Sequence, residues 1–201
     1  MSEYCLKVNK PGSDTLIVSF AGHNKNMGGI PRFEFVRFLE THFPHTSRHF
    51  YMDPDLNLYH SGIRGLTKSV EETADYLRKE VQGFSHVLFL GASGGGYAAI
   101  LFGSLLGVQS VVAFIPQTVR RAKTGVDEKY RDLLPHMHAD TQYYLYGDVT
   151  ISDPLNIHHI SHCERVADIL NVHVARRKRV DLPTMRDNGA LKEAIHNAIN
   201  K

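Results

Sequence analysis

The stretch from Val87 to Thr118 contains no charged residue, and it constrains the fold more than any other part of the sequence. It is long enough to cross a bilayer as one apolar helix. However, glycines at 91–96 interrupt it, and a β-branched run follows near its end. A buried strand, a helix and a second buried strand produce the same hydropathy, because both faces of a parallel sheet are covered. We therefore predict no membrane span, but three buried elements: a strand over 87–90, a helix over 95–106 and a strand over 110–115.

Further apolar runs bounded by turn-forming residues occur on both sides of this stretch. The alternation of strands and helices predicts βαβ units, and hence a three-layer α/β/α fold with a mainly parallel sheet. No repeat or linker divides residues 1–201, so we expect a single domain, in which the polar segment 117–140 forms either a small lid or a surface helix. The other expected strands are 4–8, 15–21, 49–52, 141–146 and 172–175, and the other expected helices are 70–83, 162–170 and 191–199.

Composition argues against several classes of function. The formal net charge is +2 over 201 residues, which provides no strong field toward nucleic acid or an acidic membrane. The two cysteines, Cys5 and Cys163, lie far apart and lack CxxC spacing, which fits a reducing compartment rather than a disulfide scaffold. The first residues lack the basic start and apolar core of a secretory signal, so we expect a cytoplasmic protein. The sequence does not predict an oligomeric state.

Ser93 lies in the run GASGGGY, which begins at Gly91 and has the G-x-S-x-G spacing of a nucleophile elbow. A serine on a sharp strand-to-helix turn takes a strained backbone conformation that only small neighbours tolerate. The turn exposes the hydroxyl, and the N–H groups at the start of the helix point toward developing negative charge. The expected strand before Ser93 and the expected helix after it complete this context. We therefore predict that Ser93 is a nucleophile.

The same glycines partly fit a dinucleotide-binding loop. Gly91, Gly94 and Gly96 have G-x-x-G-x-G spacing, whereas the dinucleotide fingerprint is G-x-G-x-x-G. The next expected strand leads into Pro116 and Gln117, without the acidic residue that would hold a ribose hydroxyl. We expect no cofactor, and an NAD(P)-dependent enzyme remains as an alternative.

The segment GASGGGYAAILFG, with the strand ending SFAGHN and the 53–65 segment, resembles small proteins of the α/β-hydrolase superfamily. It is similar to esterase-like and acyltransferase-like members, some of which are associated with bacterial surface glycans. The resemblance implies that the loop at Gly22 and His23, together with Gly94, donates the oxyanion N–H groups. Asn24 and Tyr97, which adjoin these positions, are expected to contact the substrate.

In that superfamily an acid and then a histidine follow the serine along the chain. The acid is expected after the strand 141–146, where Asp153 is favoured over Asp148. An ordinary turn or helix-capping aspartate is the alternative for both residues. The loop after the last expected strand, 175–185, contains no histidine, although the base is expected there.

A histidine from elsewhere in the chain is therefore expected to act as the base. His158 and His159 are the first choice, and the alternatives are His162, His23 and His60. Each histidine taken alone is more often an ordinary surface or hydrogen-bonded side chain than a base. Together with His162 and Cys163, His158 and His159 give the spacing H-H-x-x-H-C, which matches no closed zinc pattern. We predict no metal.

A basic run, which includes Arg176 and Arg177, occupies the place where the histidine is expected. Such a run is usually a solvated loop, but beside an active site these two arginines would bind an anionic substrate. The leading hypothesis is a serine hydrolase or acyltransferase that acts on a small ester through an acyl-enzyme. A carbohydrate acyl ester is implied by the resemblance alone. The missing histidine supports a second hypothesis, a catalytically silent protein of this fold that binds a ligand or partner.

Overall fold

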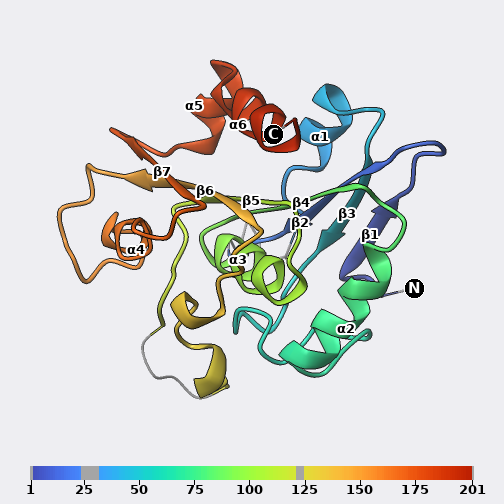
Figure 1. The fold of residues 1–201 in the computed structure, drawn as a ribbon, viewed down its shortest axis with the longest axis horizontal. Helices are drawn as coiled ribbons and strands as arrows, with labels where there is room; N and C mark the ends of the chain where they lie inside the picture. Colours follow the sequence, from blue (N-terminus) through green and yellow to red (C-terminus); the bar gives the residue numbers. More distant parts are fainter. Residues whose placement is uncertain (1, 24–31, 121–124, 201) are drawn as a thin grey trace.

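The computed structural model describes residues 2–23, 32–120 and 125–200, which form a seven-stranded sheet between two layers of helices (Figure 1). The strand order is β1-β3-β2-β4-β5-β6-β7. β1 pairs antiparallel with β3, and every other neighbouring pair is parallel. The strands are β1 (Cys5–Val8), β2 (Thr15–Phe20), β3 (Ser47–Tyr51), β4 (His86–Ala92), β5 (Ser110–Phe114), β6 (Gln142–Asp148) and β7 (Val172–Arg177).

Helices cover both faces of the sheet, which confirms the predicted three-layer fold. One apolar core joins Ile17 and Val112 of the sheet to Leu39 and Ile195 on α1 and α6. The other core lies against α2 and α3 on the opposite face, around Phe89. Figure 1 shows α1, α5 and α6 on one side and α2, α3 and α4 on the other. The helices are α1 (Val36–His42), α2 (Val70–Glu80), α3 (Gly94–Leu106), α4 (Ser161–Glu164), α5 (Leu182–Asp187) and α6 (Ala190–Ile199).

The uncharged stretch forms β4, α3 and β5, as predicted. α3 is buried from Gly94 to Ser104, because the sheet lies on one side of it and α2 and the 128–136 segment lie on the other. This burial on all sides explains why the sequence resembles a membrane span without being one. None of the described helices has the length and apolarity needed to cross a bilayer.

The helix predicted over 162–170 is shorter than expected. α4 ends at Glu164, and the chain continues in turns that place Val166 and Ile169 against the core. The backbone bonds from Val166 to Cys163 and from Ile169 to Val166 span three residues rather than four. This spacing is typical of 3₁₀-type turns, in which side chains three residues apart point to the same side. Apolar residues at every third position can therefore all face the core.

The polar segment 117–140 does not form an α-helix in its described part. It contains two 3₁₀ turns, Glu128–Tyr130 and Leu134–His136, and a short bridge between Val119 and Asp132. Tyr130 is buried, and its carbonyl accepts the hydroxyl of Tyr97 at 2.5 Å. The described residues of this segment thus pack beside α3. Residues 121–124 lie outside the described part of the chain.

Glycines allow α3 to approach β2 and β4 at van der Waals distance. A Cβ atom on Gly95 would lie 2.1 Å from the carbonyl oxygen of Phe20. A Cβ atom on Gly91 would lie 2.2 Å from the carbonyl carbon of Gly95. These distances are far below any normal contact, and the obstructing atoms belong to the backbone, which cannot rotate away. The start of α3 is therefore fixed against the carboxyl ends of two central strands.

We predict that Gly95→Ala lowers the free energy of unfolding by about 3 kcal/mol, since overpacking against the backbone forces the helix away from the sheet. The measurement is urea denaturation followed by circular dichroism. Gly96→Ala is the matched control, because the residue is in the same turn and its Cβ would lie 3.2 Å from its nearest neighbour, the Pro116 side chain. This contact is far less severe than that at Gly95, so we expect a smaller loss of stability. Equal stabilities of the two variants would contradict this account of the packing.

Candidate active site

Ser93 lies between the end of β4 and the start of α3 in a conformation that side chains rarely adopt. Its φ is 52° and its ψ is −117°. The Ser93 N–H donates to the carbonyl of Phe114 at 2.9 Å, and its carbonyl accepts the N–H of Tyr97 at 3.0 Å. These two bonds and the close helix contact hold the residue in its strained conformation. The predicted strand-to-helix turn is therefore present at Ser93.

The Ser93 hydroxyl forms a hydrogen bond with a histidine from another part of the chain. Its Oγ lies 2.7 Å from Nε2 of His158, which belongs to the loop between β6 and α4. The main-chain N–H of His158 donates to Oδ1 of Asn156 at 2.9 Å, which fixes the loop around His158. Burial lowers the pKa of His158 below its ordinary value. The ring is therefore neutral near pH 7 and can accept a proton from the hydroxyl.

The neighbouring histidines make other contacts. Nδ1 of His159 lies 2.9 Å from the hydroxyl of Ser161. Nδ1 of His162 accepts the N–H of Thr118 at 3.2 Å, and burial together with nearby positive charge lowers the pKa of His162 to about 4. Of the two histidines named as first choice, His158 is the one that the structure joins to Ser93. Within the described ranges, no group of three His, Cys, Asp or Glu side chains is arranged to hold a metal ion.

Asp148 and Asp153 form hydrogen bonds within their own loops. Asp153 Oδ1 accepts the N–H of Leu155 at 2.9 Å. Asp148 Oδ1 accepts the N–H and the hydroxyl of Thr150, and its Oδ2 accepts the N–H of Val180 at 3.0 Å. Burial opposes ionisation of Asp148, but these donors outweigh it and hold its pKa below the ordinary value. In the described structure neither carboxylate is hydrogen-bonded to His158.

Asp148 instead joins the end of β6 to the loop that follows β7. That loop, at 180–183, is part of the wall of the cavity beside Ser93. A buried carboxylate that accepts three hydrogen bonds fixes this wall more firmly than side-chain packing alone. The role that the structure supports for Asp148 is therefore to position the cavity wall.

A cavity of about 400 Å³ opens at Ser93. It lies at the carboxyl ends of the parallel strands, where ligands bind in open α/β sheets. Its wall combines apolar side chains with a few polar groups, as in most small-molecule sites. The lining residues are Gly22, His23, Glu34, Ala92, Ser93, Ile115, Ile157, His158, Val180, Asp181, Leu182 and Pro183.

The residues expected to form the oxyanion site lie together at this cavity. Gly94 is the first residue of α3, so its N–H has no acceptor within the helix. Gly22 and His23 follow β2 and line the cavity beside Ser93. A Cβ atom on Gly94 would lie 3.2 Å from Cδ2 of His23, which shows that the His23 ring packs on the start of α3.

The expected substrate contacts are distributed differently. Tyr97 is fully buried, and its hydroxyl contacts His60 and Tyr130 rather than the cavity. Arg176 pairs with Glu164, and the Arg177 guanidinium lies over the ring of Tyr146. Tyr97 and the two arginines are absent from the cavity wall among the described residues. Asn24 lies outside the described residues.

Glu34 is a cavity residue that sequence reasoning missed. Burial raises the pKa of Glu34 to about 7, although the N–H of Gly22 favours the ionised form. Its Oε2 is buried without a hydrogen-bond partner in the described structure. Phe35, the next residue, has a φ of 65° and directly precedes α1. No periodic pattern or motif surrounds Glu34 in the sequence, so the fold alone brings it to the site.

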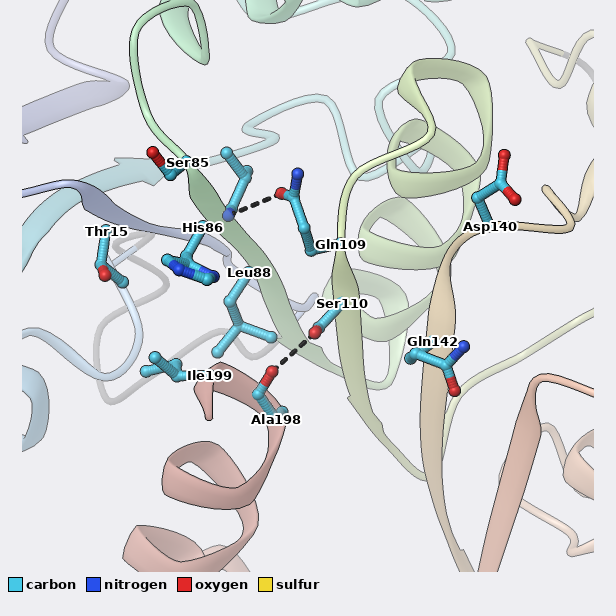
Figure 2. A pocket seen from close by; sticks show the side chains of 11 residues that line it. Thr15, Ser85, His86, Leu88, Gln109, Ser110, Asp140, Gln142, Ala198 and Ile199 are labelled. Atoms are coloured by element: carbon cyan, nitrogen blue, oxygen red, sulfur yellow. Dashed lines mark hydrogen bonds between the residues drawn. The ribbon is translucent and has the colours of Figure 1, made fainter. Parts of the chain in front are cut away.

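A second cavity, of about 340 Å³, lies at the amino ends of the parallel strands (Figure 2). The side chains of Thr15, His86 and Gln142 line it, near the amino ends of their strands. Gln109 accepts the N–H of Val87 there, and Ser110 donates to the carbonyl of Ala198. These two polar side chains therefore bind neighbouring elements of the fold to one another. The cavity lies at the amino ends of the strands, whereas the elbow lies at their carboxyl ends.

Because ionisation of a buried carboxyl is unfavourable, Glu34 destabilises the fold as pH rises from its ordinary pKa of 4.5 through about 7. We predict that Glu34→Gln is more stable than the wild type by about 1–3 kcal/mol at pH 8, and by little at pH 5. The measurement is chemical denaturation at both pH values. The control is Glu40→Gln at an exposed position on α1, which should show no such difference. A Glu34→Gln effect independent of pH would contradict burial of an ionisable group.

No protein-family model matches this sequence, and no curated protein matches it either. Solved structures do match its fold. The capsule O-acetyltransferase of Neisseria meningitidis serogroup A has a TM-score of 0.65 at 13% identity, over 96% of this chain and 92% of that one. A lipase-esterase related protein from Clostridium acetobutylicum has a TM-score of 0.60 at 11% identity, over 98% and 99%. A fluorophosphonate-binding serine hydrolase of Staphylococcus aureus has 0.58 at 14% identity, over 96% and 86%. At these identities the likeness establishes that the chain has the α/β-hydrolase fold.

Proposed function

We propose that this protein is a serine hydrolase or acyltransferase that acts on a small ester, with Ser93 as nucleophile and His158 as general base. The observation that carries the proposal is the 2.7 Å hydrogen bond between Ser93 Oγ and His158 Nε2, formed at a strained elbow and beside a cavity. Serine hydrolases and an O-acetyltransferase among the structures of the same fold support it.

In the first step, the Ser93 hydroxyl transfers its proton to His158 Nε2 while Oγ forms a bond to the ester carbonyl carbon. The carbonyl oxygen becomes an oxyanion, and the main-chain N–H groups of Gly94 and His23 are the proposed donors to it. The ester C–O bond then breaks, and the leaving oxygen takes a proton from a protonated histidine at the cavity, so that it departs as an alcohol. The acyl-enzyme on Ser93 is released by water in hydrolysis or by a second hydroxyl in acyl transfer.

His158 performs this step without a carboxylate partner in the described structure. Burial disfavours the imidazolium form, so a proton on His158 is shorter-lived than in a complete Ser-His-Asp triad. Loss of the orienting acid in such triads lowers the rate by about 10⁴-fold. We therefore expect slow turnover compared with typical esterases. The same observation favours the second candidate function, a silent protein of this fold that binds a ligand.

The cavity supports a small substrate. Its volume of about 400 Å³ is at the lower end of the range for small-molecule sites. A carbohydrate acyl ester is our preferred substrate, because one structure of this fold is a capsule O-acetyltransferase. Polar cavity residues, among them Glu34 and Asp181, offer hydrogen-bonding groups to sugar hydroxyls.

We predict that a fluorophosphonate probe labels Ser93 of the wild type, and that Ser93→Ala is not labelled. His158→Gln should be labelled about 10²–10⁴-fold more slowly, since it lacks the general base. The matched control is His173→Gln, on the edge strand β7, whose ring contacts Gln142 and which should be labelled at the wild-type rate. The measurement is the labelling rate from intact-protein mass spectrometry.

The pH dependence of the same reaction provides a second readout. The base must be neutral, and the pKa of His158 lies below its ordinary value of 6.5, so the labelling rate should fall only at a pH below 6.5. A wild type that is unlabelled between about pH 6 and 9 would favour the silent binding protein. Tight binding of NAD(H) or NADP(H) would instead favour a dinucleotide-dependent enzyme.

A further inference from the structure

A second histidine at the cavity is paired with a buried carboxylate. Nε2 of His23 lies 3.5 Å from Oδ2 of Asp53, and the Asp53 side chain is 1% exposed. Asp53 accepts N–H groups from Asp55, Asn57 and Tyr59 at 3.1, 2.8 and 3.0 Å, so its position is fixed by the loop after β3. Burial opposes its ionisation, but His23 and these donors outweigh burial and hold the pKa of Asp53 below its ordinary value.

The orientation of the His23 ring leaves one nitrogen available to the cavity. Nε2 is buried and faces Asp53 at 3.5 Å without forming a hydrogen bond in the described structure, whereas the side chain as a whole is 27% exposed. Cδ2 packs near Gly94, at the start of α3. The exposed part of the ring therefore lies away from Nε2 and Cδ2, which leaves Nδ1 as the nitrogen that can reach a substrate. Nδ1 forms no hydrogen bond within the described structure.

The cavity thus contains two incomplete units. Ser93 and His158 are a nucleophile and a base without a carboxylate, whereas His23 and Asp53 are a base and a carboxylate without a nucleophile. Ser93, His158 and His23 line the same cavity, and Gly94, which follows Ser93, contacts the His23 ring. The Asp53 carboxylate lies 3.5 Å from the His23 ring, whereas His158 has no carboxylate beside it in the described structure and burial lowers its pKa.

We infer that the His23–Asp53 pair is a second acid–base unit, which gives a proton to the leaving alcohol and later takes one from the attacking water or acceptor hydroxyl. This inference rests on the proposed function and makes His23 a further catalytic residue, with Asp53 as its positioning residue. The main-chain N–H of His23 keeps its separate role at the oxyanion.

The proton transfers balance over one cycle. In acylation, Ser93 gives its proton to His158, the Oγ–C bond forms, and the breaking C–O bond releases an alcohol that takes the proton of His23. His158 is then charged and His23 neutral. In deacylation, the water or acceptor hydroxyl gives its proton to His23 while its oxygen bonds to the acyl carbon. Ser93 Oγ leaves as the C–Oγ bond breaks, takes the proton of His158, and both histidines return to their starting states.

This division of roles also indicates the class of substrate. A leaving group needs an acid only when its alcohol is weakly acidic, because a phenolate with electron-withdrawing groups leaves without a proton. A dedicated acid at the leaving-group side therefore fits an unactivated alkyl ester, such as an acyl group on a sugar hydroxyl. An activated aryl ester or thioester would not require it.

The test compares two acetate esters that differ only in the leaving group, p-nitrophenyl acetate and benzyl acetate, in the wild type and in His23→Gln. This substitution keeps the main-chain N–H at position 23. We expect the acylation rate with p-nitrophenyl acetate to change by less than about 3-fold, and that with benzyl acetate to fall by about 10²–10⁴-fold. After acylation by the aryl ester, the variant should accumulate acetylated Ser93, because water lacks its base. His196→Gln, at an exposed position on α6, is the matched control.

A burst of the wild-type amplitude in a variant, measured with the aryl ester, shows that the variant is folded and that its nucleophile works. Equal losses of acylation rate with both esters would overturn the inference, because His23 would then act at the oxyanion or through structure. Unchanged rates with both esters would overturn it as well. A wild type that forms no acyl-enzyme with either ester would contradict the proposed function itself, and this inference with it.

Discussion

The close contact between the start of α3 and the ends of β2 and β4 is the constraint on which the rest of the site depends. Glycines at 91 and 95 allow backbone atoms to approach where any Cβ atom would collide. The chain must reverse direction in a single residue between strand and helix, and Ser93 adopts a positive φ of 52° as a result. The hydroxyl is thereby directed out of the sheet, and the first N–H groups of α3 are placed beside it. The proposed nucleophile and the proposed oxyanion site are consequences of one packing contact.

The partners of Ser93 come from loops that this contact does not fix, and they differ from the usual arrangement of the fold. The loop after β7, where the histidine is expected, instead forms the start of α5 and a wall of the cavity. His158 comes from the preceding crossover, after β6, and reaches Ser93 from there. Asp148 fixes the cavity wall through Val180 rather than orienting the base. The proposed site therefore has Ser93 in the standard place of the nucleophile, and its proposed proton-transfer groups are distributed around one cavity.

The sequence predicted the features that depend on neighbouring residues. The apolar strands, the glycines and the helix after Ser93 are local signals, and the three-layer fold followed from their alternation. The helix expected over 70–83 is likewise present as α2, and Ser69 caps its start by accepting the N–H of Glu72. The sequence did not distinguish His158 from His159, because their difference lies in the direction of two adjacent side chains in an irregular loop. Glu34 and the His23–Asp53 contact were not predicted, since they join segments that become neighbours only when the sheet forms. The short helices α1 and α5 were missed, as each has too few turns to give a periodic pattern.

The account as a whole requires that Ser93 react within a site preorganised by the elbow and by the loop after β2. The most direct measurement is a crystal structure of the protein after reaction with a small fluorophosphonate. We predict phosphorus bonded to Ser93 Oγ, with its phosphonyl oxygen about 3 Å from the main-chain nitrogens of Gly94 and His23 and with His158 beside the adduct. An adduct whose oxygen points away from both nitrogens, or phosphorus bonded to another residue, would contradict the account.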